Sequence, residues 1–214
     1  MDITQLILDD HHEQRRLFSI LEQVDRSDTG TLSAVWGRLA AFLDLHAEAE
    51  EEIFYPALLQ AGRRAAEDET LDAIHDHNEI RDAVAAAAQH AVGTPEWFAA
   101  VAGANRANGD HMAEEEREGL TDFRRLASLQ LRHDLAVSFI AFEARNYAGV
   151  PPVDKDPAGY VREEEQRQGL DGQLDATGGS ATGGSATGGS ATGGPAAGGA
   201  ATEGSLSIGS LREG

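Results

Sequence analysis

Two short stretches, HAEAEEE at residues 46–52 and HMAEEE at residues 111–116, decide the fold prediction for this sequence. Side chains four residues apart lie one above the other on the same face of a helix. Each stretch contains a histidine followed four residues later by a glutamate, on a face that continues an apolar stripe. The sequence therefore directs an imidazole and a carboxylate from each stretch into the interior of a helical protein. The two pairs are His46–Glu50 and His111–Glu115.

Apolar residues around these stretches recur at the spacing of amphipathic helices. Thr94, Pro95 and Glu96 add a helix start signal, because these residue types favour the N-cap and the first turn. No stretch alternates strictly enough to predict a strand. The pattern predicts an all-α fold, an up-down-up-down four-helix bundle with an extra C-terminal helix and a disordered tail. The predicted bundle helices cover residues about 2–25, 32–60, 68–91 and 95–118, and the fifth covers about 126–146.

The two remaining bundle helices each carry one histidine on the inward stripe. These residues are His11 in the first predicted helix and His77 in the third. His75 lies two positions before His77, almost on the opposite side of the helix. A small shift of the helical register would exchange the two, so at the level of sequence either of them could face inward.

Four histidines and two glutamates thus converge on one axis. Buried charges are costly unless they are paired or bound to a metal ion, and this set of donors suits two divalent or trivalent ions. Nitrogen and oxygen donors without sulfur are typical of iron, manganese or zinc sites. Each histidine–glutamate pair supplies a terminal imidazole and a carboxylate able to bridge, and each lone histidine completes one ion. The predicted metal ligands are His11, His46, Glu50, His77, His111 and Glu115.

The other polar and aromatic residues of these stretches are predicted to have ordinary structural roles. Tyr55 and Trp97 are expected to be core aromatics, and Glu114 is a candidate for a contact outside the metal ligands. Solvated or capping positions are expected for the remaining histidines and glutamates, namely His12, His75, His90, His133, Glu51, Glu52 and Glu116.

Composition excludes several function classes. The 214 residues carry a formal net charge of −20, which repels nucleic-acid phosphates and predicts no nucleic-acid role. The absence of cysteine excludes disulfides and thiol chemistry and suits a reducing cytosol. The first residues lack the pattern of a signal peptide, and no apolar stretch is long enough for a membrane span, so we expect a cytoplasmic protein without membrane attachment. No Ser-His-Asp or phosphate-loop pattern is present.

The composition changes beyond the predicted bundle. The bundle with its fifth helix occupies residues 1–147, and an acidic connector follows at 148–170, with a short solvated helical turn expected within VREEEQRQ. Residues 171–203 consist almost wholly of Gly, Ala, Thr and Ser, the composition of a flexible linker. The last stretch, GSLSIGSLREG at 204–214, carries regularly spaced aliphatic residues that are too few to build a core.

The bundle motifs resemble the hemerythrin-like, or HHE cation-binding, domain over about residues 1–147. The resemblance is carried by DDHHEQRRLF, HAEAEEEIFYPAL, HDHNEIRDAV and HMAEEEREGL. It implies a four-helix bundle with a non-haem di-iron centre, in which two iron ions share an oxo or hydroxo bridge. The two glutamates, Glu50 and Glu115, would bridge the irons. Oxygen-carrying hemerythrins have a fifth histidine where this chain has Ala73, a departure that favours reaction with peroxide, oxygen or nitric oxide over reversible oxygen carriage.

The C-terminal stretch GSLSIGSLR resembles the cargo-loading peptide of encapsulin systems. The resemblance implies that an encapsulin shell protein is a partner and that the chain lies inside an encapsulin nanocompartment. Docking on the inner wall of the shell would use Leu206, Ile208, Gly209 and Leu211.

Together the two resemblances predict an encapsulated protein that binds or turns over peroxide, oxygen or nitric oxide and protects against oxidative and nitrosative stress. Alternatives are a module that senses oxygen or iron or stores iron without turnover, and iron oxidation inside the shell. The fifth predicted helix carries Phe139, Phe142 and Tyr147, which would either cover the bundle or pair two copies as a homodimer.

Overall fold

The computed structural model describes residues 1–62 and 64–169. These residues form helices and no strand, so the predicted all-α class is confirmed. The predicted tail and the docking residues Leu206, Ile208, Gly209 and Leu211 lie outside the described residues, and the division of the chain at residues 147, 170 and 203 stays a prediction.

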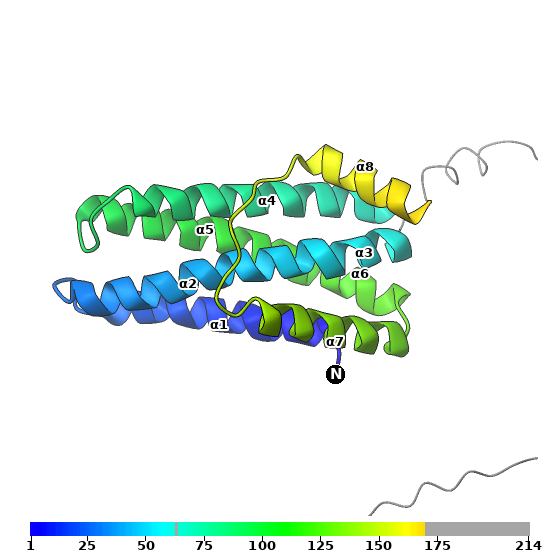
Figure 1. Ribbon diagram of the computed structural model, residues 1–214, viewed down its shortest axis with the longest axis horizontal. Helices are drawn as coiled ribbons and strands as arrows, with labels where there is room; N and C mark the ends of the chain where they lie inside the picture. The colour runs from blue at the N-terminus through cyan, green and yellow to red at the C-terminus, as the bar shows by residue number, and fades with distance from the viewer. Residues whose placement is uncertain (63, 170–214) are drawn as a thin grey trace, which may run out of the picture. The chain divides into compact units, whose positions relative to one another are not determined.

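Four long rods form the bundle (Figure 1). The first rod is α1 (Ile3–Gln23), and the second runs through α2 (Thr29–Ala49), the π-helical segment η1 (Glu50–Phe54) and α3 (Tyr55–Gly62). The third is α4 (Arg64–Ala88), and the fourth is α5 (Pro95–Arg117) continued by α6 (Gly119–Leu126). Helix α4 packs along α5, and α1 packs along α2, as short connections between successive helices require.

The helix boundaries follow the local chemistry of the chain. Asp2 caps α1 by accepting a hydrogen bond from the backbone N–H of Thr4. Thr94 caps α5 in the same way through the N–H of Trp97, with Pro95 as the first helical residue. The start predicted at Thr94 is therefore confirmed, because a hydroxyl there satisfies a backbone donor that has no partner within the helix.

Two further helices cover the bundle. Helix α7 (Leu129–Arg145) packs on α1 and α2 and buries Ala136 and Phe139, and α8 (Pro157–Gln168) packs on α4 and α3. The helical turn expected within VREEEQRQ is present, but it was wrongly expected to be short and solvated, since α8 has 12 residues and buries Val161 and Glu164. The burial depends on contacts with helices far away in sequence, which the charged pattern of this stretch does not reveal.

The core consists of two apolar clusters with a polar layer between them. One cluster, including Ile3, Phe54 and Phe139, lies around α3, α6 and α7. The other, including Leu39 and Trp97, lies toward the α1–α2 and α4–α5 turns. Buried histidines, carboxylates and amides lie at the level between the clusters. No helix among residues 1–62 and 64–169 is both long and apolar enough to cross a lipid bilayer.

Candidate metal centre

The six predicted ligands come from all four rods and are buried together. His11 lies on α1, His46 and Glu50 on the second rod, His77 on α4, and His111 and Glu115 on α5. Their relative exposures range from 0% to 6%. This convergence places two carboxylates and four imidazoles in one water-poor interior, although their role as ligands stays a prediction.

One half of the site joins the first two rods. Ligand atoms of His11, His46 and Glu50 all lie within 4.8 Å of one another. The Nε2 atom of His46 lies 3.0 Å from Oε1 of Glu50, and the Nε2 atom of His11 lies 3.4 Å from Oε2 of Glu115. Two imidazoles and oxygens from two carboxylates therefore surround one point.

The other half of the site joins the second rod to α4 and α5. Ligand atoms of Glu50, His77 and His111 again lie within 4.8 Å of one another. The Nε2 atoms of His77 and His111 are 3.1 Å apart, and Oε2 of Glu50 lies 3.3 Å from Nε2 of His77. Glu50 thus directs one oxygen toward each half of the site, as a bridging carboxylate would.

Each of the four histidines turns its second ring nitrogen toward a carboxylate. A carboxylate accepts hydrogen bonds, so His11, His46 and His77 donate from Nδ1, and Nε2 of each ring faces the interior, where the neutral imidazole offers a lone pair. Nδ1 of His111 faces Asp76 at a longer distance, as an ion pair. The contact of His111 is the longest of the four. The Nδ1 distances are His11–Glu116 2.9 Å, His46–Asp10 3.1 Å, His77–Glu51 2.7 Å and His111–Asp76 3.5 Å.

Two of these carboxylates, Glu51 and Glu116, were expected from the sequence to be solvated, and this expectation was wrong. Glu51 is 1% exposed, and Glu116 is half-buried against His11 and Arg15. Each follows a predicted ligand and lies about 100° further around the helix, where it meets a neighbouring helix instead of water. Glu114, the predicted outer contact, is exposed, and Asp76 is the residue that faces His111 Nδ1.

The buried donor atoms fit a pair of cations. Nε2 of His11 and of His46, Oε1 of Glu50 and both oxygens of Glu115 are buried and make no hydrogen bond, and the closest contacts among them are ion pairs of 3.0 Å and 3.4 Å. The Nε2 atoms of His77 and His111 face each other at 3.1 Å, and both offer lone pairs to a cation once the two imidazoles are neutral. Buried polar atoms without a hydrogen bond are rare and costly, and a cation in each half of the site would satisfy all of these.

The profile of the hemerythrin HHE cation binding domain matches residues 2–121. The chain belongs to this family. A crystal structure of a hemerythrin HHE cation binding domain-containing protein from Mycobacterium kansasii is similar in fold, with a TM-score of 0.58 and 17% identity over 76% of this chain and 98% of that chain. No curated protein matches the sequence. The predicted hemerythrin-like fold is thus confirmed, and the His/Glu clusters are those of a domain family that binds metal cations.

Carboxylates of the site raise the pKa of His11, His46 and His77 when no metal is bound. Burial lowers the pKa of His77, but hydrogen bonds with Glu50 and Glu51 outweigh burial and raise the pKa to about 9. The pKa of His46 is raised well above its ordinary value, because Glu50 and Asp10 together outweigh burial. Burial raises the pKa of Glu50, yet His46 and His77 hold it well below its usual range. The metal-free interior is therefore a set of ion pairs whose protons a cation must displace.

Helix α7 contributes a carboxylate, Glu143, on the Nδ1 side of His46. Asp10, His46 and Glu143 place ligand atoms within 4.8 Å of one another. Burial, together with the negative charge of Asp10, raises the pKa of Glu143 to about 8. Glu143 thus lies beside Asp10, which accepts a hydrogen bond from His46. Helix α7 thereby places an acidic residue next to the carboxylate that orients His46.

Tyr55 is a buried core aromatic, as the sequence predicted. Its hydroxyl also reaches the candidate metal site. Its hydroxyl is 3.4 Å from Oε2 of Glu50 and 3.4 Å from Nε2 of His77. In an α-helix the two residues would differ by about 140°. The π-helical segment Glu50–Phe54 turns by less per residue, which reduces this angle and brings the two residues closer to one side, and such segments often occur at functional sites. Trp97 is a core aromatic, as predicted.

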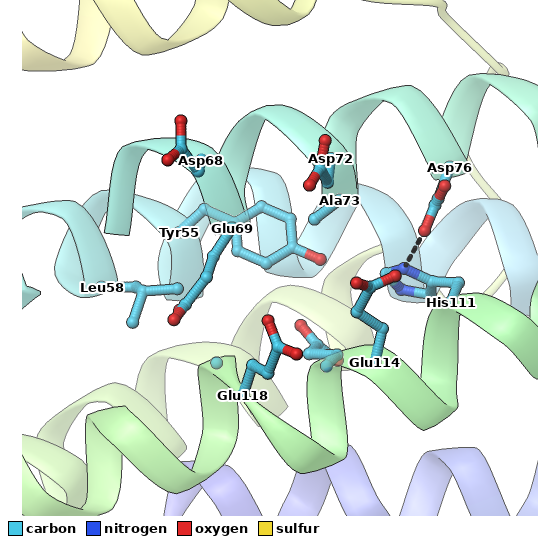
Figure 2. A pocket seen from close by; sticks show the side chains of 12 residues that line it. Tyr55, Leu58, Asp68, Glu69, Asp72, Ala73, Asp76, His111, Glu114 and Glu118 are labelled. Atoms are coloured by element: carbon cyan, nitrogen blue, oxygen red, sulfur yellow. Dashed lines mark ion pairs between the residues drawn. The ribbon is translucent and has the colours of Figure 1, made fainter. Parts of the chain in front are cut away.

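A cavity of about 80 Å³ opens beside His111 and Glu115 between α4 and α5 (Figure 2). Ala73 lines it, one turn before His77 on α4. This is the position at which the oxygen-carrying relatives are expected to have a fifth histidine. The small side chain of Ala73 leaves room for water or a small ligand next to the centre.

The histidines that the sequence excluded lie apart from the metal centre. His12, His75, His90 and His133 are exposed. The Nε2 atom of His75 lies 3.2 Å from Glu79 on the same exposed face of α4. The question of register is thus settled in favour of His77 as the inward residue.

Proposed function

We propose that the HHE domain holds two iron ions at its His/Glu site and degrades hydrogen peroxide. His11 and His46 would hold one ion, and His77 and His111 the other, with Glu50 and Glu115 shared between them. The observation that carries the proposal is the position of Glu50, whose two oxygens face the two histidine pairs separately. Two iron ions so close together supply or take up two electrons, the number exchanged in peroxide chemistry.

The reaction that needs no further reactant is disproportionation, in which two molecules of hydrogen peroxide give two of water and one of oxygen. One peroxide takes up two electrons and two protons while its O–O bond breaks, and the other gives up two electrons and two protons. The hydroxyl of Tyr55 lies at the centre with its pKa raised well above the usual value by burial and by nearby carboxylates. It therefore remains a hydrogen-bond donor for an oxygen atom of the substrate.

The chain around the centre limits competing reactions. The apolar clusters on either side exclude bulk water, and the cavity lined by Ala73 admits only small molecules. Oxygen and nitric oxide are small enough to enter the same space. We therefore propose a role in protection against oxidative and nitrosative stress.

Metal analysis, absorption spectroscopy and oxygen release from added peroxide test this function. The wild type should contain two iron ions per chain, show near-ultraviolet charge-transfer bands and release oxygen. His46→Ala and Glu115→Ala should lose metal and activity together, and His133→Ala, which alters an exposed histidine, should behave as the wild type. Equal oxygen release from all four proteins would contradict the proposal, and bound iron without turnover would favour sensing or storage.

We propose further that the chain is cargo of an encapsulin shell protein and so resides in a nanocompartment. The support is the resemblance of GSLSIGSLR to a cargo-loading peptide behind a Gly-rich linker. Leu206, Ile208 and Leu211 would fill apolar pockets on the shell, and Gly209 would let the backbone lie close. Co-expression with a shell protein should load the full chain but not a chain that lacks residues 204–214. Loading of the truncated chain would exclude this role.

A homodimer through α7 is a further proposal. Leu129, Val137 and Ile140 are 75%, 50% and 42% exposed, and pairing two copies would remove these side chains from water. Sedimentation should give a dimer for the wild type and a monomer for Val137→Glu/Ile140→Glu. A monomeric wild type would contradict this proposal without affecting the metal centre.

A further inference from the structure

Two facing rows of carboxylates line the cavity beside the metal centre (Figure 2). Asp68, Asp72 and Asp76 follow one another at four-residue intervals along α4, so they share one face of that helix. Glu114 lies on α5, which packs against α4, and Glu118 is the residue that caps the end of α5. The two rows form an acidic vestibule, defined by these five residues and Glu69.

The inner end of the vestibule is a buried carboxylate whose oxygens make no hydrogen bond and whose contact with His11 is an ion pair of 3.4 Å. Glu115 is 6% exposed, lines the cavity together with His111, and has no hydrogen bond to either carboxylate oxygen. An acidic surface cluster alone is common. Here the cluster continues inward to oxygens that make no hydrogen bond and are themselves predicted metal ligands, and this continuity points to a cation.

Positive charge is scarce along the vestibule. Among the described residues that line the cavity there is no lysine or arginine. Arg117 pairs with Glu118 at 2.9 Å and with Glu114 at 3.7 Å, and its side chain is 62% exposed. Burial and the charges of Asp122 and Glu118 raise the pKa of Glu69 to about 6, which reflects the crowding of like charges.

We propose that the acidic vestibule is the loading route of the metal centre, and that it binds a hydrated divalent cation transiently before the cation reaches Glu115 and His111. The inference rests on the proposed metal-binding function. Carboxylates and retained water are the ligands that hard divalent cations prefer. Hydrogen peroxide and nitric oxide carry no charge, so the negative potential selects for the cation and not for these substrates.

Both the negative charge of the vestibule and its width are expected to set the rate at which a cation reaches the metal centre. A cleft lined by charge of one sign raises the local concentration of counter-ions and their rate of association, and salt weakens the effect. Ala73 keeps the inner end open next to His111. A larger residue there should hinder passage without altering the charge.

The test measures the rate at which metal-free protein takes up Co²⁺, whose visible absorption changes when histidine and carboxylate bind it. Asp68→Asn/Asp72→Asn removes two charges from the vestibule. Asp82→Asn/Asp110→Asn removes two charges from exposed positions elsewhere on α4 and α5, and so serves as the matched control. Ala73→Leu narrows the cavity and leaves the charge unchanged.

At low salt, uptake by Asp68→Asn/Asp72→Asn should be roughly threefold to tenfold slower than that of the wild type, and high salt should reduce the difference. The control should be near the wild-type rate, and Ala73→Leu should be slow at any salt concentration. All four proteins should reach the same final Co²⁺ content. Equal slowing by the vestibule and control variants, or slowing by neither, overturns the loading route alone. A wild type that binds no Co²⁺ overturns the proposed function and the route with it.

Discussion

The Nδ1 atom of His77 lies 2.7 Å from Oε1 of Glu51, a carboxylate buried within the bundle. Arg81 approaches the same oxygen to 2.9 Å, and Lys155 approaches the other oxygen to 2.6 Å. These cations and His77 hold the pKa of Glu51 near 2 despite its burial. Glu51 thus stays ionised and fixes the ring of His77 with Nε2 toward the metal centre.

We predict that Glu51→Gln weakens metal binding by about tenfold to a hundredfold, the usual effect of removing a carboxylate that orients a metal-binding histidine. The amide can still accept a hydrogen bond but carries no charge, so His77 becomes a poorer donor to the ion. Glu52→Gln is the matched control, because Glu52 is adjacent in sequence and exposed. Calorimetric titration of metal-free protein gives the two affinities. Similar affinities for both variants would show that Glu51 does not orient His77.

We predict that Glu50 is needed to bind both metal ions, whereas each histidine is needed mainly to bind one of them. Glu50→Ala removes the oxygens that face His46 and His77, so we expect loss of most of the bound metal. His77→Ala should leave roughly one ion per chain, because the His11–His46 half stays intact. Metal analysis after dialysis provides the measurement. Retention of two ions by Glu50→Ala would exclude a bridging role.

Sequence analysis found the bundle and the inward histidines because both depend on local periodicity. The apolar stripes carry His11, His46, His77 and His111 at the helical spacing, and the structure buries all four. A period of 3.6 residues needs no knowledge of which helices are neighbours. The class of fold could therefore be predicted from single stretches of the chain.

The carboxylates behind the histidines could not be predicted in the same way. Asp10 contacts His46, and Asp76 contacts His111, across helix interfaces that the sequence does not specify. Tyr55 reaches Glu50 only because a π-helical segment interrupts the α-helical register. From the sequence, each residue was placed at 100° per position along a regular α-helix. That placement does not show which helices pair or where the helix type changes locally.

The pH dependence of metal binding follows from the raised pKa values of the histidines. His77, with a pKa of about 9 in the metal-free protein, is protonated at neutral pH and must lose a proton to bind an ion. Affinity should therefore rise by about tenfold per pH unit for each displaced proton, and level off above pH ~9. Calorimetry at pH 7 in buffers with different ionisation enthalpies should detect the released protons. The same titration above pH 9 should detect fewer.

The free energy of unfolding of the metal-free protein should fall as the pH rises, whereas the metal affinity rises. The pKa of His77 is raised from 6.5 to about 9 on folding. Its contribution to stability is fully present below pH 6.5 and is lost as the pH rises through 9. Urea unfolding of the metal-free wild type and of His77→Gln gives the free energy of unfolding of each protein at each pH. The difference between the two values should be smallest at high pH. A constant difference across this window would contradict the ion-pair account.

Ala73→His tests whether the open position next to the centre sets the chemistry. The imidazole would fill the cavity beside His111 and add a nitrogen donor, which leaves less space for peroxide. Oxygen release from peroxide should fall several-fold, and the absorption spectrum of the iron-loaded protein should shift. Ala73→Leu fills the same space without a donor, so it should slow peroxide degradation and leave the spectrum near that of the wild type. Unchanged peroxide degradation in both variants would mean that the substrate does not use this cavity.

Phe139 links the covering helix α7 to the metal centre. Its ring centroid lies 6.2 Å from that of His46, and the side chain is fully buried. Phe139→Ala should lower the free energy of unfolding by about 3–5 kcal/mol, the usual result of removing a buried aromatic ring. It should also let water reach His46 and weaken metal binding. His133→Ala is the control on the same helix, since His133 is exposed and its truncation should change stability by less than about 0.5 kcal/mol. Equal, small effects of the two substitutions on urea unfolding would show that α7 does not seal this side of the site.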